Sequence, residues 1–140
     1  MLKTHLTHPQ LLGALGRAGH GSKILIADGN YPFSTGSNKA SERVFLNLAP
    51  GVLTVTEVLK HLLTAVPVEA AEVMMPSEGP EPPIFREFRE LLGSDIVLEP
   101  LERFTFYEAA RGGDLALIIA SGDQRLYANL LLTVGVVAPT

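Results

Sequence analysis

The first candidate for chemistry is a histidine between two glycines, His20. Glycine on either side frees the backbone to take left-handed dihedrals, so we expect a sharp turn here. Imidazole gives and takes protons near neutral pH, as a general acid or base must. Asp28 ends the expected strand over 23–28, at the sheet edge where α/β proteins tend to bind ligands. The two residues together predict proton-transfer chemistry. A histidine just past a helix end also serves as a cap, and His20 taken alone favours that role.

A second candidate lies in the aromatic run over 103–108. Arg103 and Tyr107 are four residues apart, so they share one face of an expected helix. A charged donor beside an aromatic ring suits a sugar, because C–H faces pack on rings while hydroxyls meet polar groups. Phe104 and Phe106 are interpreted as core or interface residues. Arg103 is therefore the residue of this run that indicates a ligand.

A third candidate follows the buried run over 115–120. If residues 127–129 are extended, Tyr127 and Asn129 point to the same side. A phenol and an amide both hydrogen-bond to hydroxyl groups. Turn chemistry accounts for the preceding Gly-Asp pair but not for the Tyr-Ala-Asn unit. That unit is therefore a candidate binding segment.

The remaining histidines and the one glycine-rich run predict neither a metal site nor a phosphate loop. His5 and His8 straddle an expected helix start, and His61 lies far away on the polar side of another helix, so all three are interpreted as solvated. The run over 16–23 ends Gly-Ser-Lys and joins a helix to a strand. A Walker A loop ends Gly-Lys-Ser/Thr and joins a strand to a helix.

The elements that must position these residues alternate along the chain. Helices are expected from an N-cap at Thr7 to the Gly19 region, from a capping box at Thr54 and Glu57 to Pro67, and over 84–92 and 102–111. Strands are expected over 23–28, 43–47, 68–75, 96–99, 115–120 and 127–136. Residues 29–41 and the proline-rich 76–83 are expected to be loops. This alternation predicts an α/β layered domain.

Length and composition limit the classes of protein. A chain of 140 residues predicts one domain, over 1–140, with a full core. Hydrophobic residues make up 46% and charged residues 19%, so we expect apolar surface to be buried in an oligomer interface. A net charge of -4 without a Lys/Arg cluster argues against nucleic acid as a partner. The absence of cysteine excludes disulfides and thiolate chemistry. No run has the length of a membrane span or signal peptide, so a cytoplasmic protein with no membrane partner is expected.

Taken in order, these motifs resemble the RbsD/FucU family of sugar mutarotases, which includes D-ribose pyranase and L-fucose mutarotase. The resemblance runs nearly end to end and consists of several separated motifs. They are Met1-Leu-Lys-Thr4, Gly19-His20-Gly21, Asp28-Gly-Asn-Tyr-Pro32, Val73-Met-Met75, Arg103-Phe-Thr-Phe-Tyr-Glu108, and Tyr127-Ala-Asn129 followed by Leu130-Leu-Leu and Gly135-Val136.

The resemblance implies a three-layer α/β/α sandwich assembled as a ring-shaped homo-oligomer, often a decamer. It implies an isomerase that needs no metal and no cofactor and that interconverts sugar anomers by general acid/base ring opening and closing. His20 would be the catalytic acid/base. The monosaccharide substrate would meet Asp28, Arg103, Tyr127, Ala128 and Asn129.

Three alternatives for the activity remain at this point. The aromatic run around Arg103 favours L-fucose as the substrate. Ala128 favours a D-ribose pyranase, which interconverts pyranose and furanose forms, because fucose mutarotases often have glycine there. Gly29 also departs from the alanine that is usual in the family. A non-catalytic sugar-binding protein of the same fold is the third alternative, and the intact His20 and Asp28 argue against it.

Overall fold

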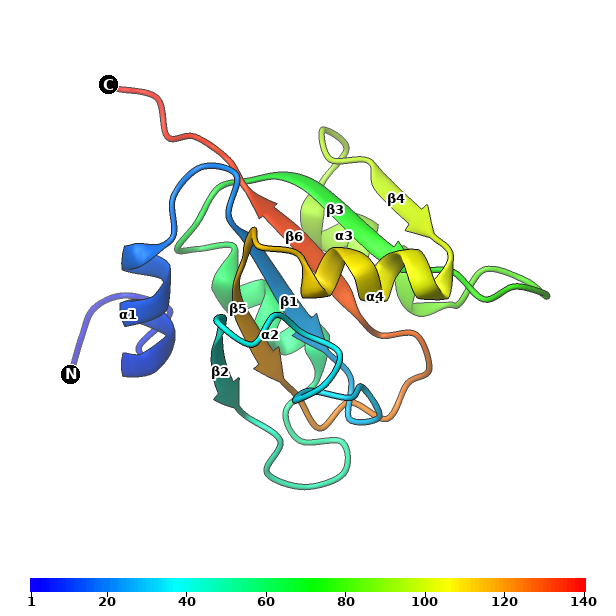
Figure 1. The fold of residues 1–140 in the computed structure, drawn as a ribbon. Helices are drawn as coiled ribbons and strands as arrows, with labels where there is room; N and C mark the ends of the chain where they lie inside the picture. Colours follow the sequence, from blue (N-terminus) through cyan, green and yellow to red (C-terminus); the bar gives the residue numbers. More distant parts are fainter.

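A mixed sheet of six strands forms the middle of the molecule in the computed structural model, which describes residues 1–140 (Figure 1). The strands are β1 (Lys23–Ala27), β2 (Glu42–Phe45), β3 (Val68–Met74), β4 (Leu98–Leu101), β5 (Leu115–Ala120) and β6 (Leu130–Val134), in the spatial order β2-β5-β1-β6-β3-β4. Five strands run parallel, whereas β6 lies antiparallel between β1 and β3. Strands β1 and β5 are continuous apolar runs, as strands covered on both faces require.

Helices cover both faces of this sheet. They are α1 (Pro9–Arg17), α2 (Val55–Leu62), α3 (Ile84–Leu92) and α4 (Arg103–Arg111). Ile24 and Ile26 of β1 face the larger core, which α1, α2 and α3 complete, while Leu25 faces a smaller core with Phe106 of α4. Figure 1 shows α4 alone on its side of the sheet, above the loop that follows β1. The expected three-layer α/β/α arrangement is therefore confirmed.

Local sequence signals set most helix ends. Thr54 and Glu57 form the expected capping box at the start of α2. The side chain of Glu102 accepts two backbone N–H groups at the start of α4. Gly93 ends α3 in the left-handed region, with a φ of 85°. These short-range patterns were sufficient to predict the helices.

Several expected boundaries are wrong, and those of the strands differ because a partner far along the chain decides them. The N-cap of α1 is His8 rather than Thr7, since Nδ1 of His8 accepts the N–H of Leu11 at 3.3 Å. Helix α2 ends at Leu62, and turns lead on to Pro67. Pairing with β5 limits β2 to Glu42–Phe45, and pairing with β3 places β4 two residues later than expected. No helix has the length and apolar character needed to cross a bilayer.

The ends of the strands lie along two opposite edges of the sheet. We call one the carboxyl edge, where the five parallel strands end and β6 begins, and the other the amino edge, where those strands begin and β6 ends. The arrow of β6 points against that of β1 in Figure 1. Residues that follow β1 and residues that precede β6 therefore meet at the carboxyl edge.

Candidate functional site

A buried carboxylate and amide pair forms the centre of the carboxyl edge. Nδ2 of Asn129 donates to Oδ2 of Asp28 at 3.1 Å, and the N–H of Asp28 donates to Oδ1 of Asn129 at 2.8 Å. The N–H of Asn30 donates to the remaining carboxylate oxygen at 2.9 Å. Asp28 and Asn129 are each 4% exposed. Burial raises the pKa of Asp28 above its ordinary value, and the hydrogen bonds from Asn30 and Asn129 offset part of that rise.

The residues just before β6 are not extended, and β6 covers only Leu130–Val134, so the expected strand over 127–136 is wrong at both ends. Tyr127 has a φ of 61°, a left-handed conformation that costs a residue other than glycine about 1 kcal/mol. The alternation that would put Tyr127 and Asn129 on one side is therefore lost. Asn129 turns to Asp28, the Ala128 side chain is wholly buried in the larger core, and half-buried Tyr127 lines a pocket of about 580 Å³ beside the proline-rich loop.

Arg103 is connected to this centre by two aromatic rings. Its guanidinium carbon lies 5.7 Å from the ring centre of Tyr107, which confirms that the two share a helix face. The ring of Tyr107 lies 5.6 Å from that of Tyr31, and the Tyr31 N–H donates to the carbonyl of Asp28 at 3.2 Å. Burial raises the pKa of the Tyr31 phenol, which donates to the carbonyl of Gly36. Tyr31 was not predicted as a site residue, although it lies in the run Asp28-Gly-Asn-Tyr-Pro32, one of the motifs that carry the family resemblance.

A salt-bridge network around Asp123, which was interpreted from the sequence only as a turn residue, supports the candidate binding segment. The guanidinium of Arg125 donates to both oxygens of Asp123, at 3.0 and 2.7 Å, and to Glu87 of α3 at 2.8 Å. Asp123 also accepts the N–H of Val55, the first residue of α2, at 2.9 Å. Burial acts to raise the pKa of Asp123, but the hydrogen bonds from Arg125 and Val55 outweigh it and leave the pKa below its ordinary value. An acid two residues before an arginine is the only signal that the sequence offered.

His20 lies at the opposite end of β1 from Asp28, so the predicted pair does not form within one chain. Its turn precedes Lys23, and the strand from Lys23 to Ala27 places its ends about 13 Å apart. The half-exposed imidazole instead meets Glu69 at the start of β3, with Nε2 2.9 Å from the nearer carboxylate oxygen. The structure thus brings all the predicted sugar-contact residues to the carboxyl edge and leaves the predicted catalytic residue at the amino edge.

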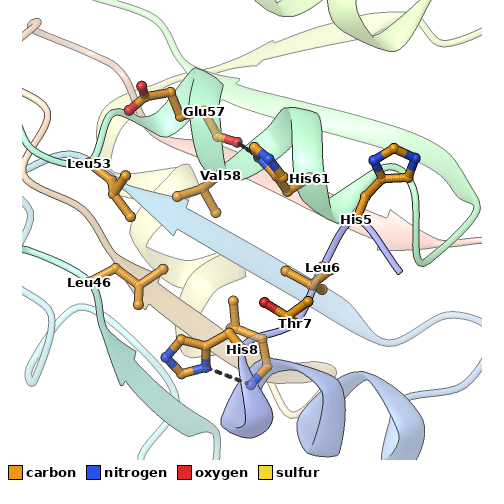
Figure 2. Close-up of a pocket in the computed structure, with 10 residues that line it drawn as sticks. His5, Leu6, Thr7, His8, Leu46, Leu53, Glu57, Val58 and His61 are labelled. Atoms are coloured by element: carbon orange, nitrogen blue, oxygen red, sulfur yellow. Dashed lines mark hydrogen bonds between the residues drawn. The ribbon is translucent and has the colours of Figure 1, made fainter. Parts of the chain in front are cut away.

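The other three histidines line one pocket, which corrects the expectation that His61 lies far from His5 and His8 (Figure 2). This pocket of about 330 Å³ lies between the N-terminal segment, α1 and α2, over a floor that includes Leu53 and Val58. Nδ1 of His8 accepts from the backbone of α1, and Nδ1 of His61 lies 2.8 Å from a carbonyl of α2. No group of three or more His, Asp or Glu side chains in the structure is arranged to hold a metal ion.

The geometry at the carboxyl edge suits a ligand rich in hydroxyl groups. A fixed carboxylate and a fixed amide supply acceptors and donors at set positions, while Arg103 and the half-buried rings of Tyr107 and Tyr127 add a charged donor and apolar faces. Carboxyl ends of parallel strands are also the usual place for a ligand in an α/β sheet.

Comparisons with known proteins agree over almost the whole chain. A model of the RbsD / FucU transport protein family matches residues 1–137. The chain is 36% identical over 143 residues to the fucose mutarotase of Danio rerio, covering 94% of this chain and 90% of that protein. It is 28% identical to a D-ribose pyranase of Clostridium perfringens, covering 98% and 99%. The structure matches the fucose mutarotase of Streptococcus pneumoniae in complex with L-fucose with a TM-score of 0.77, at 29% identity and 94% coverage of each chain.

Proposed function

This chain belongs to the RbsD/FucU family of sugar mutarotases and pyranases, and we propose that it is a cofactor-independent mutarotase that interconverts the anomers of L-fucose. The observation that carries the proposal is the carboxyl edge, where the Asp28–Asn129 pair, Tyr127 and Arg103 offer an ordered set of groups for a sugar. Similarity to the fucose mutarotases of Danio rerio and Streptococcus pneumoniae favours L-fucose.

The chemistry requires one proton to move between two oxygens of the sugar. A base takes the proton of the anomeric hydroxyl, the bond from C1 to the ring oxygen breaks, and an acid protonates that oxygen. Rotation about C1–C2 and the reverse steps close the ring on the other face. We assign both proton transfers to the imidazole of His20, because imidazole both takes and gives protons near neutral pH. General acid–base catalysis by one side chain typically contributes about 10²–10⁴-fold.

Within one chain His20 cannot reach a sugar held by Asp28, because β1 separates them. We therefore propose that the site forms between two copies of the chain, one supplying the carboxyl edge and the other supplying His20 from its amino edge. Large apolar side chains that lie exposed at or near the carboxyl edge support such an assembly. Phe45, Phe104 and Leu126 are 59%, 68% and 69% exposed.

Mixing two inactive variants tests the shared site. His20→Ala and Arg103→Ala change exposed side chains on opposite edges, so each should fold and assemble while losing most anomer exchange. If copies mix at random, about a quarter of the interfaces in a co-expressed 1:1 assembly would carry both native residues, and about that fraction of the wild-type rate should return. Exchange that stays at the level of the single variants would overturn the shared site.

A D-ribose pyranase is the second candidate, favoured by the similarity to the clostridial enzyme over nearly the full length of both chains. Ala128 does not strengthen it, because the side chain is buried in the core and only its backbone can meet a ligand. NMR saturation transfer on L-fucose and D-ribose side by side separates the two, with the faster catalysed exchange expected for L-fucose. Sugar binding by calorimetry without any catalysed exchange would instead identify a binding protein.

A further inference from the structure

A carboxylate at the amino edge holds the imidazole of His20. Nε2 of His20 lies 3.0 and 2.9 Å from the two carboxylate oxygens of Glu69, the second residue of β3. No other side chain makes a hydrogen bond or ion pair with Glu69. The imidazole is 59% exposed and the carboxylate 45%, so a molecule approaching this edge can still reach the other ring nitrogen.

The backbone of β6 sets the distance between these two residues. The N–H of Gly21 donates to the carbonyl of Val134 at 3.0 Å, which attaches the His20 turn to the end of β6. Val134 also pairs with the first residue of β3, which is next to Glu69. A Cβ added at Gly135 would lie 3.3 Å from the Cβ of Glu69, so the glycine leaves room for that side chain. The backbone of β6 therefore brings the His20 turn and the start of β3 together. Glu69 itself lies at the register shift between Val68 and Ala70, and the two half-exposed side chains complete the contact.

We propose that Glu69 is a positioning residue for proton transfer by His20, an inference that rests on the function proposed above. A carboxylate can only accept, so it selects the form of the ring in which Nε2 carries the proton. Nδ1 then has a free lone pair in the neutral ring. A carboxylate that orients a catalytic imidazole in this way is a recurrent arrangement in general-base catalysis.

Nδ1 of His20 is then the atom that moves the proton. Nδ1 of His20 takes the proton of the anomeric hydroxyl, while Nε2 keeps its own proton and continues to donate it to the carboxylate of Glu69. The imidazolium formed is stabilised by the carboxylate, and Nδ1 returns the same proton to the ring oxygen as the C1–O bond breaks. No net proton is gained or lost, and Glu69 does not touch the sugar.

Variants at Glu69 test the proposal through the split between kcat and KM. Glu69→Ala should lower kcat for anomer exchange about 10–100-fold with KM unchanged, by analogy with the loss of the hydrogen-bond partner of a metal-bound histidine. Glu69→Gln keeps an acceptor oxygen and should recover part of that loss. The matched control is Glu72→Gln, which breaks the 3.1 Å ion pair between another carboxylate of β3 and Lys23 of β1 but leaves His20 alone.

A second measurement keeps the test independent of activity. In protein with ¹⁵N-labelled histidine, neutral His20 of the wild type should show one tautomer, with Nε2 protonated. It should show a mixture in Glu69→Ala. If Glu69→Ala matches Glu72→Gln in kcat and its His20 tautomer is unchanged, Glu69 has no positioning role. If the wild type catalyses no anomer exchange, the proposed function fails, and the tautomer measurement alone then decides whether Glu69 orients His20.

Discussion

The two edges of the sheet carry the proposed functional residues in opposite states. At the carboxyl edge Asp28 and Asn129 are buried, bonded to each other in both directions, and fixed by neighbouring backbone. At the amino edge His20 and Glu69 are about half exposed and share one ion pair. The difference fits two different requirements of the proposed roles. Groups that bind a sugar gain from being held in place before the sugar arrives, whereas a group that carries a proton must stay accessible to the sugar.

Replacement of His20, the proposed proton carrier, is expected to have the largest effect. His20→Ala should lower the catalysed rate of anomer exchange about 10²–10⁴-fold, because the acid/base group is removed. The free energy of unfolding should barely change, since the side chain is exposed. NMR saturation transfer measures the rate, and His61→Ala, another exposed histidine, is the control. Equal rates for His20→Ala and wild type would remove His20 from the mechanism.

The corresponding change at the carboxyl edge should reduce stability. Asn129→Ala leaves a carboxylate oxygen and the backbone N–H of Asp28 buried without their partners. Each unsatisfied buried group costs about 1–3 kcal/mol, so the free energy of unfolding should fall by about that amount or more. Urea denaturation measures the change. A loss below 0.5 kcal/mol (on the order of a neutral surface substitution) would mean that this edge is less fixed than its hydrogen bonds indicate.

Low pH should destabilise the salt-bridge network that supports the carboxyl edge, because Asp123 becomes protonated. Its pKa in the folded protein lies below the ordinary value of 3.8, so the unfolded chain binds the proton more readily. The stabilisation is complete above that ordinary value and is lost as pH falls through the lower folded pKa. Asp123→Asn should lower the free energy of unfolding at neutral pH by about 1–3 kcal/mol.

The contrast with Asp28 provides the control for this pH dependence. Because the pKa of Asp28 is raised, its contribution has the opposite sign: stability falls as pH rises from 3.8 through the folded pKa. Unfolding measured from neutral pH down to below 3.8, where the stabilisation by Asp123 is lost, should therefore be less steeply acid-sensitive in Asp123→Asn than in the wild type. An unchanged slope would show that Asp123 does not carry the acid dependence.

The smallest expected effect is the loss of the ion pair at the amino edge. Exposed pairs contribute about 0.2–1 kcal/mol, so Glu69→Gln should change the free energy of unfolding by no more than that. Thermal and urea unfolding of Glu69→Gln and wild type measure it under the same salt conditions. A loss comparable to that of Asn129→Ala would show that the two edges do not differ in the way their burial indicates.

Most elements could be predicted because their signals are local. The capping box at Thr54 marked the start of α2, Gly93 marked the end of α3, and apolar runs marked β1 and β5. The boundary errors at β2, β4 and β6 have another cause. A strand extends only as far as its neighbour supplies hydrogen bonds, and the sequence of the strand does not contain that neighbour.

The candidate site also combines features with local sequence signals and features that depend on distant parts of the chain. The types of residue at Arg103 and Asn129 indicated binding of hydroxyl groups, and the family resemblance added Asp28. The structure gathers these residues at one edge. Two features were out of reach of the sequence. The left-handed Tyr127 contradicts the extended pattern that its neighbours favour, and the Asp123–Arg125 network depends on helices α2 and α3, which come from distant parts of the chain.

The sequence by itself determined which segments form helices and strands and which side chains are able to do chemistry at this protein's strand ends. Only the tertiary structure decided at which edge each of them lies. The insertion of β6 against the direction of β1 brings Asn129 to Asp28 across 101 residues and ties the His20 turn to the far end of the same strand. Strand order and direction are set by pairing between distant segments, so no local propensity records them.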